Sequence, residues 1–479
     1  MKNQTLSKQI GLALGPIIFF TVWLLPFEFI SEKGNIVIAI ALWMIIWWIT
    51  EAVSISVTAL LPLLLFPLFN IMPMEEVGAN YGSPIVFLFF GGFVLALALE
   101  KVNLHKRIAL NIIKKTGTSP NNVILGFMIA TAFMSMWISN TASTVVMLPI
   151  AISVIKLLIH DEDGFTQKDK NFALSVMLGI AFSANAGGIA TIIGTPPNSV
   201  LVGLLENEYN IEVSFFKWML LGLPFSIVLI TIIYFILVKW LFPCKGLNFI
   251  SSNNLIDSEI KKLGKVSSKE KQVLIVFSVM VFLWIFRSTI NSVFTQFKLS
   301  DTLISITGAI ALFAIPHNLK KGNFILKWDD TRNLAWGILI LFGGGLALAK
   351  GMSSAGIVAV VAEAIASTNV SVILIASLLI LLMLFMTELM SNVALIAVLA
   401  PVVAGIAIGL EIPILHLLIP VTMASSCAFM LPMATPPNAI VFASGYIKVH
   451  QMARVGIIIN IIAVLLIVAV FQFFVPFVF

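Results

Sequence analysis

The chain has little charge for its length. Asp, Glu, Lys and Arg make up only 10% of its 479 residues, while hydrophobic residues make up 60%. Soluble globular domains carry about 25% charged residues, so this composition excludes an ordinary soluble domain. The mean hydropathy of +1.08 agrees with that conclusion. The composition predicts an all-α polytopic membrane protein, because the apolar runs are long and lack the alternation that is typical of transmembrane strands.

Cysteine and histidine are also scarce. The two cysteines, Cys244 and Cys427, and five scattered histidines provide no disulfide framework and no metal-binding cluster. The net charge of +6 comes mainly from a few basic loops, where membrane orientation explains it better than nucleic-acid binding does. We therefore expect no cofactor and no nucleic-acid partner.

Apolar runs recur along the whole chain, and a helix needs roughly 20 residues to cross the membrane. Eleven runs predict membrane-spanning helices near 11–30, 36–53, 55–70, 83–100, 171–207, 217–242, 271–291, 301–316, 334–350, 413–447 and 453–478. Two further runs, 120–159 and 370–408, are nearly twice as long as one span and are polar in the middle. They predict re-entrant helical hairpins with buried tips, with two ordinary spans apiece as the alternative.

Three short phrases occur twice in the same order. Phe-Gly-Gly occurs at 90–92 and 342–344, Ser-Asn at 139–140 and 391–392, and Thr-Pro-Pro-Asn at 195–198 and 435–438. The first two pairs are 252 positions apart and the third is 240 apart. Because the order is preserved, the chain is predicted to contain an internal repeat.

Charge placement indicates that the repeat is inverted. Segment 101–118 contains five Lys and Arg residues and no acid, whereas the equivalent segment 350–370 has only Lys350 and Glu363. Short cytoplasmic loops are enriched in Lys and Arg, so the two segments should lie on opposite sides of the membrane. The same rule predicts a cytoplasmic N-terminus and an external C-terminus. Inverted repeats are typical of secondary transporters, which build one central site from both halves.

The repeated phrases are suited to binding ions. Two consecutive prolines cannot continue a helix, so both Thr-Pro-Pro-Asn phrases should break their helices. A broken helix offers carbonyl groups to cations at one end and N–H groups to anions at the other. Helix caps and structural kinks are the alternative reading of each phrase alone. With no Lys or Arg near them, bound cations would supply the positive charge for an anionic substrate, so the two should bind cooperatively.

At this point the chain resembles the divalent anion:sodium symporter family, which transports dicarboxylates and citrate. The resemblance rests on W-W-I-T-E-A at 47–52, S-M-W-I-S-N-T-A at 135–142, G-T-P-P-N at 194–198, T-E-L-M-S-N at 387–392 and A-T-P-P-N at 434–438. It implies a homodimer in the cytoplasmic membrane, with a scaffold domain and a transport domain that moves like an elevator. It also implies Na⁺ as a possible coupling ion.

The resemblance divides the chain into scaffold and repeats. The predicted units are scaffold helices in 1–82, a first inverted repeat in 83–242 (hairpin 120–159, broken helix 171–207), a cytoplasmic linker in 243–270, scaffold helices in 271–333, and a second repeat in 334–479 (hairpin 370–408, broken helix 413–447).

The resemblance also assigns site residues. It implies sodium sites formed by Ser135, Ser139, Asn140 and Gly194 in the first repeat, and by Thr387, Asn392 and Ala434 in the second. It implies that the substrate is bound by Asn140, Thr141, Thr195, Pro196, Asn392, Val393, Thr435 and Pro436.

The sequence departs from the family pattern at one tip. Val393 stands where the family usually has threonine, and the bulky Met390 lies beside the implied second cation site. Both changes remove or crowd polar ligands. We therefore expect exchange of C4/C5 dicarboxylates such as succinate, malate, fumarate and 2-oxoglutarate, with a sodium-coupled dicarboxylate or citrate symporter as the alternative.

Other classes of protein fit less well. An anion channel would also have Gly-rich and Ser/Thr-lined breaks. An intramembrane hydrolase would need a nucleophile with a base, and no histidine or aspartate lies near the motifs, so we expect no enzyme. Glu51 and Glu388 lie at or near membrane depth, where an ionisable group is either a functional residue or a satisfied structural acid.

Overall fold

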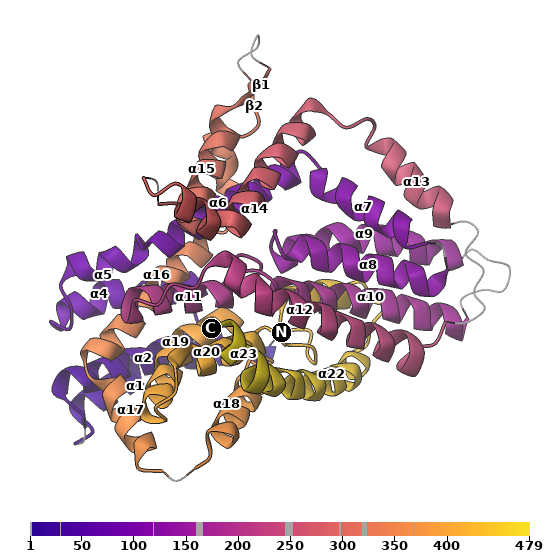
Figure 1. Ribbon diagram of the computed structural model, residues 1–479. Coiled ribbons are helices and arrows are strands. Elements are labelled where there is room, and N and C mark those ends of the chain that lie inside the picture. Colours follow the sequence, from indigo (N-terminus) through magenta and orange to yellow (C-terminus); the bar gives the residue numbers. More distant parts are fainter. Residues whose placement is uncertain are drawn as a thin grey trace.

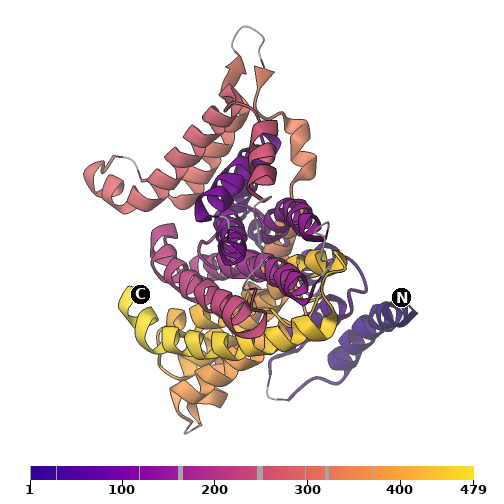
Figure 2. The same cartoon turned by 90° about the vertical axis from the view of Figure 1, so that its right-hand side faces the viewer.

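The computed structural model describes residues 2–28, 30–117, 119–159, 166–244, 252–296, 298–318, 323–368 and 370–479, and it is helical almost throughout. The chain begins with α1 (Lys2–Leu24), α2 (Glu32–Thr50), α3 (Ile55–Thr58), α4 (Leu61–Leu68) and α5 (Met74–Tyr81). Helix α1 packs against α2 and lies at the edge of the molecule (Figure 2). The start of α2 is capped by Ser31, whose side chain accepts a hydrogen bond from Gly34 N at 3.1 Å.

Two series of helices follow the same order. The first is α6 (Pro84–Lys101), α7 (Leu104–Thr116), α8 (Pro120–Ser135), α9 (Asn140–Ile159), α10 (Gln167–Gly188), α11 (Pro196–Tyr209) and α12 (Phe215–Phe235). The second is α16 (Trp336–Ser354), α17 (Ile357–Ala366), α18 (Val372–Met386), α19 (Asn392–Gly409), α20 (Ile414–Ser425), α21 (Pro436–Ala443) and α22 (Val449–Ala469).

The correspondence extends to details. Each series ends in a π-helical stretch, Ile236–Leu241 and Val470–Phe474, and the latter leads into α23 (Val475–Val478). A proline lies inside α9 at Pro149 and inside α19 at Pro401, again 252 positions apart. The order of elements therefore repeats as the phrases predicted.

The segment between the two series contains α13 (Ser252–Lys262), α14 (Ser268–Val293) and α15 (Asp301–Ala314). A small antiparallel hairpin follows, formed by β1 (Pro316–Asn318) and β2 (Asn323–Phe324), and then a 3₁₀ turn at Trp328–Asn333. Figure 1 shows the hairpin projecting from the end of α15. The sequence did not predict this hairpin. Residues 245–251 of the predicted linker lie outside the described residues.

The expected all-helical membrane fold is confirmed, although fewer helices than expected are long enough to span a membrane alone. Among the described residues, eight helices are long and apolar enough to cross. Four of the eleven predicted spans are missing because they are short, as in α3–α4 and α15, or broken, as in α10–α11 and α20–α21. The eighth candidate is α19, which the sequence placed in a re-entrant hairpin. The sequence counted each broken helix as one span.

The Phe-Gly-Gly phrases allow close helix packing. A Cβ atom on Gly91 of α6 would collide with Ser305 of α15, and one on Gly344 of α16 would collide with the carbonyl group of Ala59. Ser305 Oγ donates to the Leu88 carbonyl at 2.7 Å across the α6–α15 contact. These glycines thus serve helix packing rather than a binding site.

The basic segments that the sequence assigned to the cytoplasm are joined by ion pairs. Helix α7 is bound to α13 by Lys106–Glu259 at 2.9 Å and Lys114–Asp257 at 2.7 Å. Hydrogen bonds from Lys262 and Lys106 hold the pKa of Glu259 below its usual value. The next pair, Lys101–Asp330, joins the end of α6 to the 3₁₀ turn. The basic segments therefore lie on one side of the molecule.

The two repeats interlock at the centre. Helices α8, α9 and α10 pack together in the first half, and α18 and α19 each pack against α20 in the second (Figure 1). The second limb of each hairpin also crosses to the other half, since α9 packs against α21 and α19 packs against α11. Each hairpin therefore contacts both repeats, because its tip lies against the broken helix of its own half and its second limb packs on the other half. The division into scaffold and transport domains stays a prediction.

Candidate functional site

The first hairpin tip forms a compact cluster of oxygen atoms. Helix α8 ends at Ser135 and α9 begins at Asn140, which places both polar side chains at the turn between them. Ser135 Oγ lies 2.5 Å from Asn140 Oδ1 and 2.7 Å from the Ala184 carbonyl oxygen on α10. Gly188 and Gly194 permit this approach, because a Cβ atom on Gly188 would press against the Asn140 amide.

The second tip reproduces the cluster. Thr387 Oγ1 lies 2.6 Å from Asn392 Oδ1 and 2.6 Å from the Ser425 carbonyl oxygen on α20. Thr387 and Asn392 lie 252 positions after Ser135 and Asn140. The structure therefore builds the same three-oxygen arrangement twice from equivalent elements.

Each cluster has more acceptors than its protons can satisfy. A hydroxyl group carries a single proton, yet Ser135 and Thr387 each face two acceptor oxygens at hydrogen-bonding distance. A cation removes this deficit, because hard cations such as Na⁺ favour hydroxyl, amide and carbonyl oxygens. Among the described residues, no three His, Cys, Asp or Glu side chains gather to offer an alternative metal site.

The first cluster has a second way to satisfy itself. If the Asn140 amide rotates by half a turn, its nitrogen donates to Ser135 Oγ at 2.5 Å and to the carbonyls of Gly194 and Ala184 at 3.2 Å each. The site then closes without a cation. In this orientation the amide nitrogen faces the three acceptors, and Gly194 becomes part of the first site.

The asparagines of the Thr-Pro-Pro-Asn phrases stabilise the unwound segments. Asn198 Nδ2 donates to the Thr191 carbonyl at 2.8 Å, and Asn438 Nδ2 donates to the carbonyls of Ala428 and Leu431 at 3.1 Å each. Both asparagines are fully buried. Buried backbone groups need partners, so these side chains replace the hydrogen bonds that the breaks forgo.

Asn185 connects the two repeats. It lies on α10, and its Nδ2 contacts the Ala428 carbonyl at 3.0 Å and Thr435 Oγ1 at 3.1 Å in the second half. Its own Oδ1 is buried with no hydrogen-bond partner among the described residues. At the offset of 240 the equivalent position in the second repeat is Ser425, whose hydroxyl group donates to the Thr422 carbonyl of its own helix at 2.7 Å, so this bridge runs in one direction only.

Four helices begin at the four phrases. Helix α9 begins at Asn140, α19 at Asn392, α11 at Pro196 and α21 at Pro436. Each N-terminus carries about half a positive elementary charge from the helix dipole. The prolines at the starts of α11 and α21 lack N–H groups, so α9 and α19 offer more donors to an anion.

The implied substrate residues lie around these helix starts. Thr141 and Pro436 are exposed, and Asn140, Pro196, Asn392 and Val393 are half-buried. Thr195 and Thr435 are buried, and Thr435 caps α21 by accepting from Asn438 N at 3.4 Å. The exposed and half-buried members form the surface that a substrate can reach.

Two implied cation ligands stand apart from the oxygen clusters. The Ser139 side chain is exposed and accepts from Ala142 N at 3.1 Å, which is a helix-capping contact at the start of α9. Ala434 is buried, and its N–H donates to Leu431 O at 3.2 Å. Their proposed role as cation ligands stays a prediction.

The sequence did not identify every polar group at the centre. The carbonyls of Ala184 and Ser425 and the side chain of Asn185 were missed. A signal existed for the first half, since F-S-A-N-A-G-G at 182–188 places polar residues in an otherwise apolar helix. Carbonyl ligands carry no such signal, because every residue has one.

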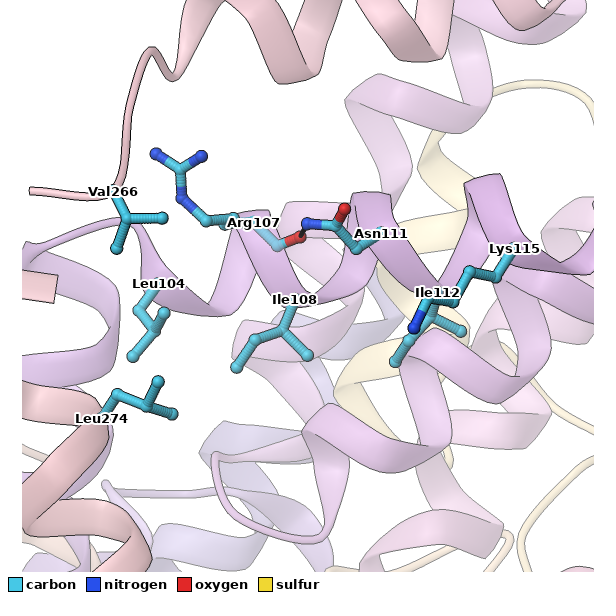
Figure 3. Close-up of a pocket in the computed structure, with 8 residues that line it drawn as sticks. All are labelled: Leu104, Arg107, Ile108, Asn111, Ile112, Lys115, Val266 and Leu274. Carbon is cyan, nitrogen blue, oxygen red and sulfur yellow. Dashed lines mark hydrogen bonds between the residues drawn. The ribbon is translucent and has the colours of Figure 1, made fainter. Parts of the chain in front are cut away.

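A surface pocket of about 330 Å³ lies away from these motifs, between α7 and the start of α14. Figure 3 shows Arg107, Asn111 and Lys115 on α7 beside apolar side chains. Arg107 pairs with Glu270 at 2.6 Å and donates to the carbonyls of Gly264 and Leu263 at 3.0 Å each. Its charge is thus already compensated, and the pocket contains none of the motif residues.

Comparison with known proteins identifies the family of the chain. The family described as "Sodium:sulfate symporter transmembrane region" matches residues 6–479. The chain belongs to this family. The sequence resemblance is thereby confirmed, and the protein is a multi-pass membrane protein of a transporter family.

Two relatives in this family align over nearly their whole length. The sodium-dependent dicarboxylate transporter SdcS of Staphylococcus saprophyticus is 41% identical, over 99% of this chain and 93% of its own. SdcS of Staphylococcus aureus strain USA300 is also 41% identical, over 98% and 92% respectively.

Two solved structures share the fold at low sequence identity. The YdaH transporter of Alcanivorax borkumensis aligns with a TM-score of 0.54 at 11% identity, over 84% of this chain and 87% of its own. MtrF of Neisseria gonorrhoeae aligns with a TM-score of 0.51 at 13% identity, over 86% and 84%. At such identities the similarity concerns the fold alone.

Proposed function

We propose that the protein is a sodium-coupled transporter of C4/C5 dicarboxylates such as succinate, malate, fumarate and 2-oxoglutarate. The observation that carries the proposal is the pair of oxygen clusters, each located at the start of a helix, where unpaired backbone N–H groups favour an anion. Cations in the clusters would supply the positive charge that the motifs lack. The sodium-dependent dicarboxylate transporters at 41% identity support the same assignment.

The coupling follows from electrostatics. A dicarboxylate carries two negative charges, and a site without Lys or Arg attracts it weakly. Two bound cations at the starts of α9 and α19 would raise the local potential, so each ligand increases the affinity for the other. Because sodium and dicarboxylate bind only together, neither is carried across the membrane alone.

Exchange of one dicarboxylate for another is the second candidate. It rests on Val393, which has no hydroxyl, and on Met390 beside the second cluster. The sequence favoured this reading, and it stays a prediction. The intact oxygen cluster at Thr387 and Asn392 gives sodium symport the stronger support.

The proposal includes the setting of the protein. We infer a homodimer in the cytoplasmic membrane, with the N-terminus cytoplasmic and the C-terminus external, in which the two repeats move against a scaffold by an elevator motion. The protein is not an enzyme in this proposal. An anion channel is disfavoured because the buried Asn198 and Asn438 close the breaks with side-chain hydrogen bonds.

Uptake of labelled succinate or 2-oxoglutarate into proteoliposomes tests this function. The inward sodium gradient and the internal dicarboxylate are varied independently. Sodium symport requires that uptake rises steeply with external sodium and needs no internal dicarboxylate. Uptake that depends on internal dicarboxylate and ignores sodium would establish exchange instead, and unsaturable flux would indicate a channel.

A further inference from the structure

Glu388 is a buried carboxylate at the second hairpin tip. It follows Thr387 directly and is only 3% exposed. None of the ion pairs among the described residues involves it. Burying a carboxylate without compensating partners costs free energy, so the groups that contact Glu388 indicate its role.

Its partners are four hydrogen-bond donors. Oε1 accepts from the backbone N–H groups of Phe429 and Met430 at 2.8 and 3.0 Å, and Oε2 accepts from that of Leu431 at 3.1 Å. Asn460 Nδ2 on α22 donates to Oε1 at 2.7 Å. An ionised carboxylate is an acceptor only, so this set fits the charged form. Three consecutive N–H groups around one anion are a strong arrangement, since hydrogen bonds to charged acceptors are roughly twice as strong as neutral ones.

The segment that Glu388 binds is the unwound part of the second broken helix. Its carbonyls at Ala428 and Leu431 accept from Asn438, and the Ala428 carbonyl also accepts from Asn185 of the first repeat. One carboxylate thus fixes a segment that contacts both repeats. The segment continues to Thr435, at the start of α21.

In the first repeat, the hairpin tip and the unwound segment are joined by an uncharged hydrogen bond. Met136 lies 252 positions before Glu388, and Thr191 lies 240 positions before Leu431. Thr191 Oγ1 donates to the Met136 carbonyl at 2.6 Å. The link from tip to unwound segment is therefore present in both halves, but only the second half makes it with a carboxylate.

We propose that Glu388 is a positioning residue that holds the unwound segment 428–431 against the second tip and thereby sets the sodium affinity of the second oxygen cluster. It contacts neither substrate nor cation. It acts by fixing the backbone of this segment through its four hydrogen bonds. The inference rests on the proposed sodium-coupled transport and adds the residue that controls one of its two ion sites.

The test uses Glu388→Gln, which keeps the shape of the side chain but removes the charge and turns an N–H donor toward the segment. Dicarboxylate uptake is measured against external sodium in proteoliposomes. We expect the half-saturating sodium concentration to rise about tenfold, while the maximal rate at saturating sodium falls less than about threefold. Thr191→Val is the matched control, because it breaks the neutral link of the first half, and we expect a sodium shift of less than about threefold.

A second readout does not depend on transport. Hydrogen exchange of the amides of residues 429–431 is measured in the purified protein with and without sodium chloride. In the wild-type protein these amides should be protected, and Glu388→Gln should abolish the protection in this segment while leaving α10 unchanged. If wild-type uptake is absent, the proposed function fails, but the exchange data still decide whether Glu388 fixes the segment.

Two results would overturn the inference. One is an unchanged sodium curve in Glu388→Gln, and the other is a lower maximal rate with unchanged sodium dependence, which a merely structural residue would give. If Glu388→Gln does not fold, Asn460→Ala replaces it, since it removes one of the four donors and retains the charge. That variant should shift the sodium curve in the same direction by a smaller factor, and no shift would also refute the proposal.

Discussion

The two hairpin tips carry the same oxygen cluster but have different surroundings. At the first tip, Trp137 is buried and packs against Phe277 of α14 and Phe215 of α12, with ring centroids 5.0 and 6.1 Å apart. The equivalent residue of the second tip, Leu389, is 68% exposed, and Met433 in the nearby break is 75% exposed. The apolar side of the first tip is therefore covered by neighbouring helices, and that of the second tip is open.

The difference shows what the repeat preserves. The ligand geometry is retained in both halves, while the apolar residues around it differ in burial. A transporter that exposes one central site to each side in turn needs such an asymmetry in each end state, with the roles of the two tips exchanged in the other. The sequence repeat alone does not reveal which tip is covered.

The largest expected effect concerns the orientation of the two halves. A cysteine introduced in 101–118 should react with an impermeant reagent only from the cytoplasmic side, and one in 351–370 only from outside. The reason is the positive charge of the first segment and its absence from the second. Labelling is compared in sealed vesicles of both orientations, with Cys244 and Cys427 replaced first. Reaction from the same side would show that the repeats are not inverted.

The next effect concerns the central amides. Asn140→Ala and Asn392→Ala each remove an oxygen from one cluster and a polar group from the start of a helix. Hydrogen bonds to charged groups are worth roughly 1.5–3 kcal/mol each, so loss of such contacts should reduce uptake at limiting sodium about 100-fold in both variants. Ser367→Ala on exposed surface serves as the control. Uptake near the wild-type rate in either variant would remove that asparagine from the site.

The sequence predicted the helical class, the repeated order of elements and the residues at the tips, because these depend on apolar patterning and on proline. It did not predict the carbonyl ligands or the hairpin of β1 and β2. Nor did it decide the role of Glu388, whose partners come from a segment about 40 residues later in the chain. Glu51 is the other acidic residue whose role the sequence left open. It is exposed at the end of α2, and its carboxylate oxygen lies 3.6 Å from Lys8 Nζ. The partners of Glu388 and Glu51 are set by contacts between residues far apart in the chain, which local sequence patterns do not predict.

Removing the hydroxyl group of each cluster in turn compares the two oxygen clusters directly. Ser135→Ala and Thr387→Val each remove one cation ligand without altering the amide. We expect the half-saturating sodium concentration to rise about tenfold in each, since one charge-assisted contact is lost. An unchanged sodium dependence in either variant would remove that hydroxyl group from its cluster.

A smaller effect is expected from restoring the family's residue at the second tip. Val393→Thr adds a hydroxyl group to a half-buried position at the start of α19, where it would face a substrate carboxylate. A net gain of roughly 1 kcal/mol for a hydrogen bond corresponds to about a fivefold lower half-saturating substrate concentration. Sodium dependence should change less than substrate affinity. If the sodium dependence instead changes more than the substrate affinity, position 393 acts on the second cation site rather than on the substrate.

The smallest effect concerns the amphipathic helices, α7 and α17, which also differ between the halves. Helix α7 is bound to α13 by Lys106–Glu259, whereas in α17 the exposed Glu363 takes part in none of the ion pairs among the described residues. Because the folded-state pKa of Glu259 is lowered, the pair stabilises the protein above the usual glutamate pKa and is lost as the pH falls through the lower folded value. Glu259→Gln should therefore cost roughly 0.2–1 kcal/mol at pH 7, and the difference from wild type should shrink as the pH falls below about 4.5. Thermal unfolding in detergent from pH 7 to 4 measures this, with Glu363→Gln as the control that should change little. An equal loss in both variants would mean that the ion pairs do not distinguish the two helices.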